Sequence, residues 1–135
     1  MKEMTFRATP ENIAAATAFV EAGLEAAECS PKAQMQIDVA MDELFGNVAR
    51  YAYAPGEGDV TVGFELDEAT RTAQITLTDS GVPFNPLKAA EPDLTASAED
   101  RPIGGLGIFL VRKTMDSLEY RYENGKNILT IRKKI

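Results

Sequence analysis

The sequence predicts a two-layer α/β (α+β) sandwich, in which helices cover one face of a mixed, mostly antiparallel sheet. Segments of alternating apolar and polar residues, typical of strands, recur on both sides of long helical patterns. Thr9-Pro10 and Ser30-Pro31 each place an N-cap residue before a proline, which is typical of a helix start. Because the chain has 135 residues, 44% of them hydrophobic, we expect residues 1–135 to form a single domain.

The first half of the chain is expected to form a strand, two helices and two more strands. Apolar residues alternate with polar ones at residues 4–8, which predicts a short strand. Helical patterns follow at residues 9–29 and 30–53, and the second stops before a Pro-Gly pair. The alternating segments 60–66 and 73–77 predict neighbouring strands.

The second half of the chain opens with a polar stretch at residues 88–103 that holds few large apolar residues. Loops of this length are uncommon in compact domains and often serve as lids, so we expect a lid here. Glycines then open a helix at residues 104–115. Alternation at residues 118–122 and 128–132 predicts a final hairpin that turns near Asn124-Gly125.

The composition excludes several kinds of function. A net charge of −7 repels phosphate backbones, so we expect no direct contact with nucleic acid. The sequence contains no histidine, which excludes a Ser-His-Asp triad, a Cys-His dyad and a histidine metal site. Proton transfer must therefore use a carboxylate, a lysine, a tyrosine or the thiol.

Several features predict a cytoplasmic protein that makes no use of a membrane. No apolar run is long enough to span a bilayer, and residues 1–5 lack the apolar core of a signal peptide. Cys29 is the only cysteine, so it has no partner for an intramolecular disulfide.

The second helical pattern carries a possible catalytic pair. Its apolar stripe should face the sheet, whereas Glu43, Asn47 and Arg50 fall on another face. One turn of helix separates the carboxylate of Glu43 from the amide of Asn47. The first is suited to accept a proton and the second to bind Mg²⁺. A solvated helix face would carry the same residues, and the motif alone leaves both interpretations open.

Asp79 ends a predicted strand with the same parity as its apolar residues, so it should point toward the core side or just beyond its edge. A carboxylate there needs a partner, and the amino group of adenine is a suitable donor. Gly81 allows a backbone to lie close to a flat base, and Pro83 stiffens the turn. A plain turn held by local Asp79 hydrogen bonds is the alternative.

Gly104, Gly105, Leu106 and Gly107 lead into the third helical pattern. Backbone N–H groups at a helix start attract anions, and glycine exposes them, which predicts a phosphate cradle. The spacing fits neither a P-loop nor a dinucleotide-binding fingerprint. A flexible helix entry is the alternative.

Taken in this order, the three motifs resemble those of the GHKL, or Bergerat-fold, ATPase superfamily. The resemblance is closest to the small bacterial anti-sigma factors that are serine protein kinases. Residues 43–53 resemble their N box, residues 79–87 their G1 box and residues 104–111 their G2 box. At Tyr51 the chain departs from many relatives, which carry histidine there. The lack of any histidine phosphoacceptor makes a sensor histidine kinase the less favoured relative.

The resemblance implies roles for these residues. Glu43 would be the general base and Asn47 the Mg²⁺ ligand. Asp79 would bind the adenine amino group, with Gly81 beside the base, and Gly105 and Gly107 would cradle the phosphates of ATP. Arg50 would help to neutralise them.

The resemblance also implies an activity and partners. We expect an ATP- and Mg²⁺-dependent serine/threonine protein kinase that binds a sigma factor as a homodimer and phosphorylates a small anti-sigma antagonist protein. A non-catalytic module, in which ATP gates partner binding, is the main alternative. ATP hydrolysis without a protein acceptor is a third, less favoured one.

Overall fold

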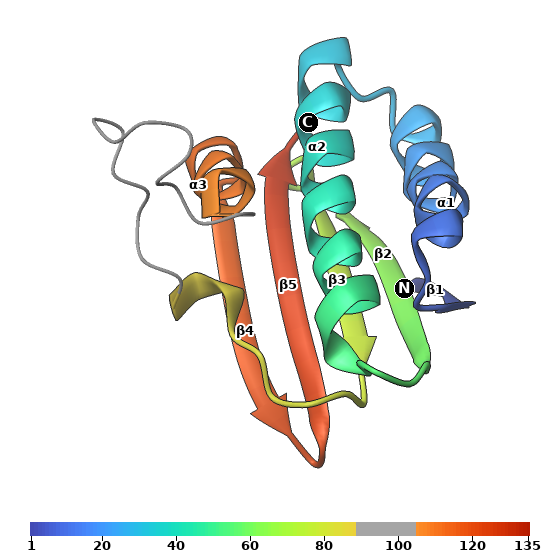
Figure 1. Ribbon diagram of the computed structural model, residues 1–135. Helices are drawn as coiled ribbons and strands as arrows, with labels where there is room; N and C mark the ends of the chain where they lie inside the picture. Colours follow the sequence, from blue (N-terminus) through green and yellow to red (C-terminus); the bar gives the residue numbers. More distant parts are fainter. Residues whose placement is uncertain (89–104) are drawn as a thin grey trace.

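The computed structural model describes residues 1–88 and 105–135. Its elements follow the predicted order (Figure 1): β1 (Lys2–Arg7), a 3₁₀ turn η1 (Pro10–Asn12), α1 (Ile13–Ala26), α2 (Pro31–Asn47), a π-helical turn η2 (Val48–Ala52), β2 (Asp59–Asp67), β3 (Thr72–Asp79), a 3₁₀ turn η3 (Pro86–Lys88), α3 (Gly105–Thr114), β4 (Ser117–Glu123) and β5 (Lys126–Lys134).

The strands form one five-stranded sheet with the order β1-β2-β3-β5-β4. This confirms the predicted fold class, and every pairing among the described strands is antiparallel. The final hairpin enters the sheet with β5 next to β3, so β4 becomes an edge strand. The register of that pairing sets Asn127 directly opposite Asp79.

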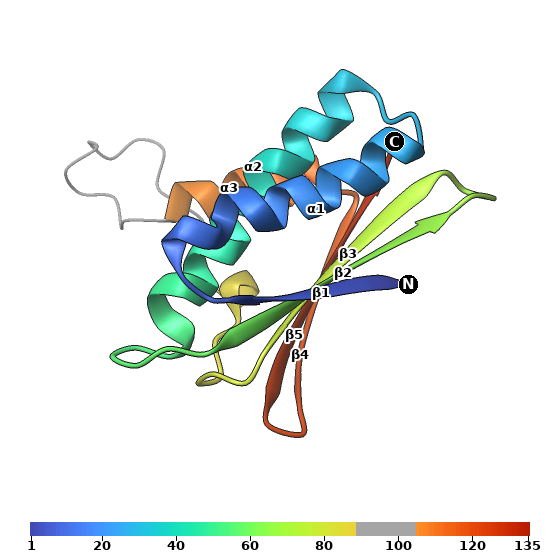
Figure 2. The ribbon, with the colours of Figure 1, turned by 90° about the vertical axis from the view of Figure 1, so that its right-hand side faces the viewer.

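The three α-helices of the described residues cover one face of the sheet, as the edge-on view in Figure 2 shows. α2 lies in the middle and packs against both α1 and α3. The core fills the space between the layers, where apolar side chains lose their contact with water. The largest fully buried side chains are Phe45, Leu24, Ile37, Met41, Leu44, Ile75, Leu77, Ile131, Val20, Val60, Val62 and Val111.

The start of α2 agrees with the sequence prediction in detail. The hydroxyl oxygen of Ser30 accepts a hydrogen bond from the N–H of Ala33 at 3.2 Å, and Pro31 occupies the first turn. Thr9 makes no such side-chain bond, and the chain passes through the η1 turn before α1 begins. The second predicted helix reaches the expected end, but its last five residues form the π-helical turn η2.

Two predicted features lie wholly or largely outside the described residues. The lid expected at residues 88–103 is described only at Lys88, which ends η3, and Gly104 is not described.

Among the described helices, none is long and apolar enough to cross a bilayer.

Candidate functional site

A pocket opens between the last turns of α2 and the strands β3, β4 and β5. The space within it and at its open mouth is about 410 Å³, and apolar side chains make up most of its lining, with a few polar ones among them, as in small-ligand pockets. Two residues predicted from the sequence, Asn47 and Asp79, contribute to its wall. The full lining is Leu44, Asn47, Val48, Ala52, Leu77, Asp79, Phe84, Pro86, Tyr120, Asn127 and Leu129.

Glu43 lies one turn before Asn47 on α2 and faces the first turn of α3. Its Oε1 is buried and makes no hydrogen bond to any described residue. A Cβ added to Gly107 would lie 2.8 Å from Oε1 and would overlap Oε2 and Cδ of the same side chain. The missing side chain of Gly107 therefore leaves the space that the Glu43 carboxylate occupies.

The surroundings of Glu43 raise its affinity for a proton. Burial raises the pKa of this carboxyl above its ordinary value, and the positive charge of Arg50 opposes the shift. A half-buried carboxylate with a raised pKa and an unsatisfied oxygen is typical of a proton acceptor in a functional site.

Asn47 and Arg50 are in direct contact. The side chain of Asn47 is buried, and its Oδ1 accepts a hydrogen bond of 3.2 Å from Nη2 of Arg50. Arg50 itself is exposed, and its guanidinium lies 5.8 Å from the ring centre of Tyr51. Tyr51 in turn packs against Phe84 at 5.9 Å between ring centres, next to the pocket. The Asn47 oxygen that we predict to bind Mg²⁺ therefore accepts a hydrogen bond from Arg50 in this structure.

Asp79 is only 6% exposed at the end of β3, so strand parity correctly predicted its inward orientation. Its Oδ1 accepts two hydrogen bonds of 2.9 Å, from the N–H of Gly81 and from Nδ2 of Asn127. Among the described residues, Oδ2 has no hydrogen-bond donor. This oxygen is the one that remains for a ligand.

Gly81 lies against protein backbone. A Cβ at this position would overlap the carbonyl oxygen of Ala52, and that same oxygen accepts a 2.9 Å hydrogen bond from the N–H of Val82. The proposed place of Gly81 beside a base stays a prediction. Pro83 is exposed and does not line the pocket.

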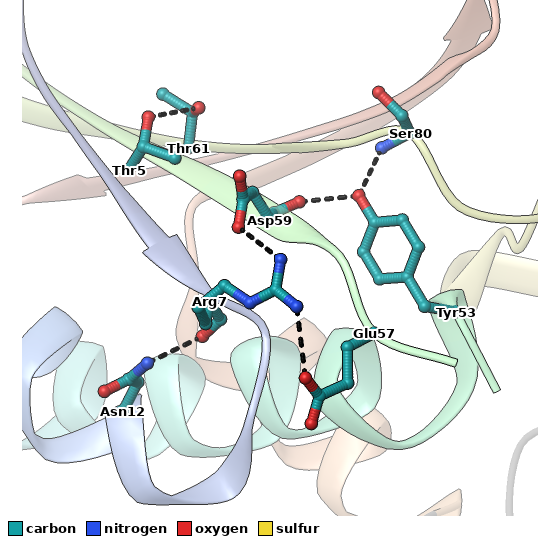
Figure 3. A network of polar contacts seen from close by, with 8 residues as sticks. All are labelled: Thr5, Arg7, Asn12, Tyr53, Glu57, Asp59, Thr61 and Ser80. Carbon is teal, nitrogen blue, oxygen red and sulfur yellow. Dashed lines mark hydrogen bonds and ion pairs between the residues drawn. The ribbon is translucent and has the colours of Figure 1, made fainter. Parts of the chain in front are cut away.

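Tyr53 fastens the same loop to the sheet, as Figure 3 shows. Its hydroxyl donates to the carbonyl of Asp59 at 2.6 Å and accepts from the N–H of Ser80 at 2.8 Å. Burial raises the pKa of this phenol, so the hydroxyl stays protonated and able to donate. The end of η2, the start of β2 and the loop after β3 are thereby joined.

The glycine-rich segment is described in part. Gly105 begins α3 and Gly107 lies in its first turn, so the helix start comes next to Glu43 as described above. Leu106 belongs to the same turn of α3. The phosphate-binding role of these residues stays a prediction.

Asn127 and Tyr120 line the pocket but were missed by sequence analysis. Asn127 is 5% exposed and bonds to Asp79 from the neighbouring strand. Nothing in its local pattern distinguishes it from other residues near a hairpin turn. The signal that could have found it is the strand register, which requires knowing that β5 pairs with β3.

Comparison with known proteins assigns the domain to a family. The sequence pattern of the histidine kinase-like ATPase domain matches residues 6–133. The chain belongs to the histidine kinase-like ATPase domain family. This confirms the resemblance to the GHKL superfamily, and membership of this ATPase family implies that the chain uses ATP.

Relatives of this histidine kinase-like ATPase domain include protein kinases. The chain is 28% identical to the serine/threonine-protein kinase BtrW of Bordetella bronchiseptica over 102 residues, which cover 76% of this chain and 71% of that protein. It is 30% identical to the serine-protein kinase RsbW of Bacillus mycoides over 95 residues, covering 67% of this chain and 58% of RsbW. The match therefore spans less than two thirds of that relative's length.

A solved structure shares the fold of the domain. The histidine kinase AdeS of Acinetobacter baumannii superimposes with a TM-score of 0.53 over 99% of this chain and 68% of that chain. The two sequences are 18% identical. At this identity the likeness shows the fold alone.

Proposed function

We propose that this chain is an ATP-dependent serine protein kinase that acts as an anti-sigma regulator and phosphorylates a small antagonist protein. The observation that carries the proposal is the Glu43 carboxylate, which is half-buried, has an unsatisfied oxygen and lies against the start of α3. A base at this place suits the transfer of a phosphoryl group to a hydroxyl. The names of the relatives BtrW and RsbW support the choice of serine as acceptor.

The residues present fit ATP and Mg²⁺. The pocket combines apolar walls with the polar side chains of Asn47 and Asp79, as ligand sites do, and the Asn47 amide offers a hard oxygen one turn from the unsatisfied Glu43. We propose that Asp79 binds the adenine amino group, with Gly81 and Pro83 near the base. Backbone N–H groups of residues 104–107 would bind the phosphates.

Glu43 performs the proton transfer in this mechanism. The hydroxyl oxygen of the acceptor serine forms a bond to the γ-phosphorus, the bond to ADP breaks, and the hydroxyl proton passes to the Glu43 carboxylate. Mg²⁺ bound at Asn47 would supply neutralisation of the phosphate charge. Arg50 adds positive charge at the same end of the site. Its contact with Asn47 keeps that charge close to Glu43.

The kinase proposal is tested by incubating the protein with γ-labelled ATP and candidate antagonist proteins. Glu43→Gln should retain ATP affinity and lose about 10²–10⁴-fold in the rate of labelling, because a positioned base contributes that much. Asp42→Asn is the matched control, since it removes an exposed carboxylate from the neighbouring position. Unchanged labelling by Glu43→Gln would overturn the role of Glu43. Nucleotide-dependent binding of a partner without any label would favour the non-catalytic module.

The proposal also covers assembly and location. We propose that residues 1–135 act as one ATPase domain, that the protein forms a homodimer and binds a sigma factor, and that it works in the cytoplasm, where ATP and sigma factors are present. Light scattering with and without a purified sigma factor tests the assembly. A monomer that leaves the sigma factor unbound would remove this part of the proposal.

A further inference from the structure

Asn127 lies on β5 and connects this strand with three other segments around the pocket through one buried amide. Its Nδ2 donates to Oδ1 of Asp79 at 2.9 Å and to the carbonyl of Val82 at 2.8 Å. Its Oδ1 accepts from the N–H of Phe84 at 3.1 Å and from the hydroxyl of Tyr120. The two N–H donors and the two acceptor positions of this amide are thus all used, on β3, β4 and the loop after β3.

The orientation of the Asn127 amide is fixed by two backbone groups. The N–H of Phe84 is only able to donate, so the atom facing it must be the amide oxygen. The carbonyl of Val82 is only able to accept, so the atom facing it must be the amide nitrogen. A rotated amide would lose both bonds and leave part-buried backbone groups unpaired, which is costly.

This orientation determines what Asp79 offers to a ligand. With the nitrogen of Asn127 turned toward it, Oδ1 of Asp79 receives one N–H bond from the amide and another from Gly81. Both bonds require Oδ1 to act as an acceptor. Among the described residues Oδ2 receives no bond, and Asp79 lines the pocket, so this carboxylate keeps an unused acceptor for a ligand there.

We infer that Asn127 is a positioning residue that orients Asp79 as a hydrogen-bond acceptor and thereby sets the preference of the pocket for purines with an exocyclic 6-amino group. The inference rests on the proposed function, because it places a nucleotide base in this pocket. An acceptor oxygen matches the amino group of adenine, and it repels the 6-oxo group of guanine. A purine without a group at position 6 leaves the acceptor unpaired.

The variant Asn127→Asp tests this inference at nearly constant volume. The new carboxylate keeps acceptors toward Phe84 and Tyr120 but turns an oxygen toward Asp79 and Val82, where the native chain has a donor. The measurement is the dissociation constant of ATP, of GTP and of purine riboside triphosphate, which lacks the 6-amino group, for each variant. Thermal melting of every variant confirms that it is folded.

The wild type should bind ATP at least about tenfold more tightly than purine riboside triphosphate, since a lost bond to a charged acceptor has about that effect. Asn127→Asp should reduce this ratio by about tenfold and should reduce discrimination against GTP as well. If Asn127 had a merely structural role, the substitution would weaken the binding of all three nucleotides by the same factor. Should Asn127→Asp not fold, Asn127→Ser, whose shorter side chain cannot make both donor bonds, should lower the same ratio.

Asn85→Asp is the matched control, because it makes the same chemical change in the loop after β3, at a residue that has no hydrogen bond to Asp79. The Asn85 side-chain oxygen accepts from the N–H of Leu87, which a carboxylate does equally well. The control should leave the ratio at the wild-type value. A folded Asn127→Asp protein with the wild-type ratio overturns the inference while the ATP site stands. A wild type that binds none of the three nucleotides overturns the proposed function.

Discussion

The Glu43 carboxylate occupies the space that a side chain at Gly107 would need. Glu43 belongs to α2 and Gly107 to α3, so the contact joins two helices that are distant in the sequence. The carboxylate is half-buried with an unsatisfied Oε1, and the space left by Gly107 allows it to lie there. The contact therefore links the glycine-rich segment to the proposed general base.

Gly107→Ala should displace the Glu43 carboxylate. The added methyl group would overlap Oε2 and Cδ, so we expect the rate of phosphoryl transfer to fall by about 10²-fold, as a misplaced catalytic group causes. Single-turnover labelling of the acceptor protein at saturating ATP measures this rate.

Gly46→Ala is the control for this change. A Cβ there would meet only the flexible end of Arg50 at 3.4 Å. Since alanine is favoured over glycine inside a helix, this variant should gain about 0.5–1 kcal/mol in the free energy of unfolding. Equal rates for Gly107→Ala and the wild type would show that the Glu43–Gly107 contact does not position the base.

The pH dependence of transfer should reflect the environment of Glu43. The base acts only when ionised, so the rate falls as the pH drops through its pKa. Burial raises that pKa, which moves the acid limb above the range of a free glutamate, and the Arg50 charge opposes the shift. Arg50→Met removes the charge and should move the acid limb to higher pH. The pH profile of kcat measures the limb.

Arg121→Met is the matched control for Arg50→Met, because this exposed arginine pairs with Glu123 on β4. It should leave the acid limb where the wild type has it. A limb that moves to lower pH in Arg50→Met, or that stays in place, would contradict the electrostatic explanation.

Gly81→Ala should detach the loop after β3 from the end of η2. A Cβ would overlap the backbone carbonyl of Ala52, which has no freedom to rotate away, and the Val82–Ala52 hydrogen bond would be lost. We expect a loss of about 1–3 kcal/mol in the free energy of unfolding, as for other steric and hydrogen-bond defects. Urea denaturation measures this loss, and ATP affinity should fall with it. Ser80→Ala, an exposed neighbour, should stay within about 0.5 kcal/mol of the wild type.

Tyr53→Phe should also destabilise the attachment of the loop after β3, but with a smaller loss in the free energy of unfolding than Gly81→Ala. The variant loses the hydroxyl that bridges Ser80 and Asp59, and water is able to reach these partly exposed groups. We expect a loss of about 1 kcal/mol in the free energy of unfolding. Tyr122→Phe removes an exposed hydroxyl for which no hydrogen bond is found within the described residues, so it should have almost no effect. Equal stabilities of the two variants would mean that the Tyr53 bridge adds nothing.

Local patterns in the sequence predicted the order of the elements and the orientation of several site residues. Ser30-Pro31 marked the start of α2, and the helical period placed Glu43 and Asn47 one turn apart on one face. The alternation in β3 turned Asp79 inward with Ala73, Ile75 and Leu77. These features depend on residues within a few positions of each other, which is why the sequence alone determined them.

The tertiary structure alone decided which of these parts meet. Asn127 reaches Asp79 because β5 pairs with β3, across a sequence separation of 48 residues. Gly81 meets the carbonyl of Ala52, and Gly107 meets Glu43, only because the loop and helices pack at these distances. Such contacts arise from strand register and from the packing of layers against a shared core. No local period in the sequence encodes either one.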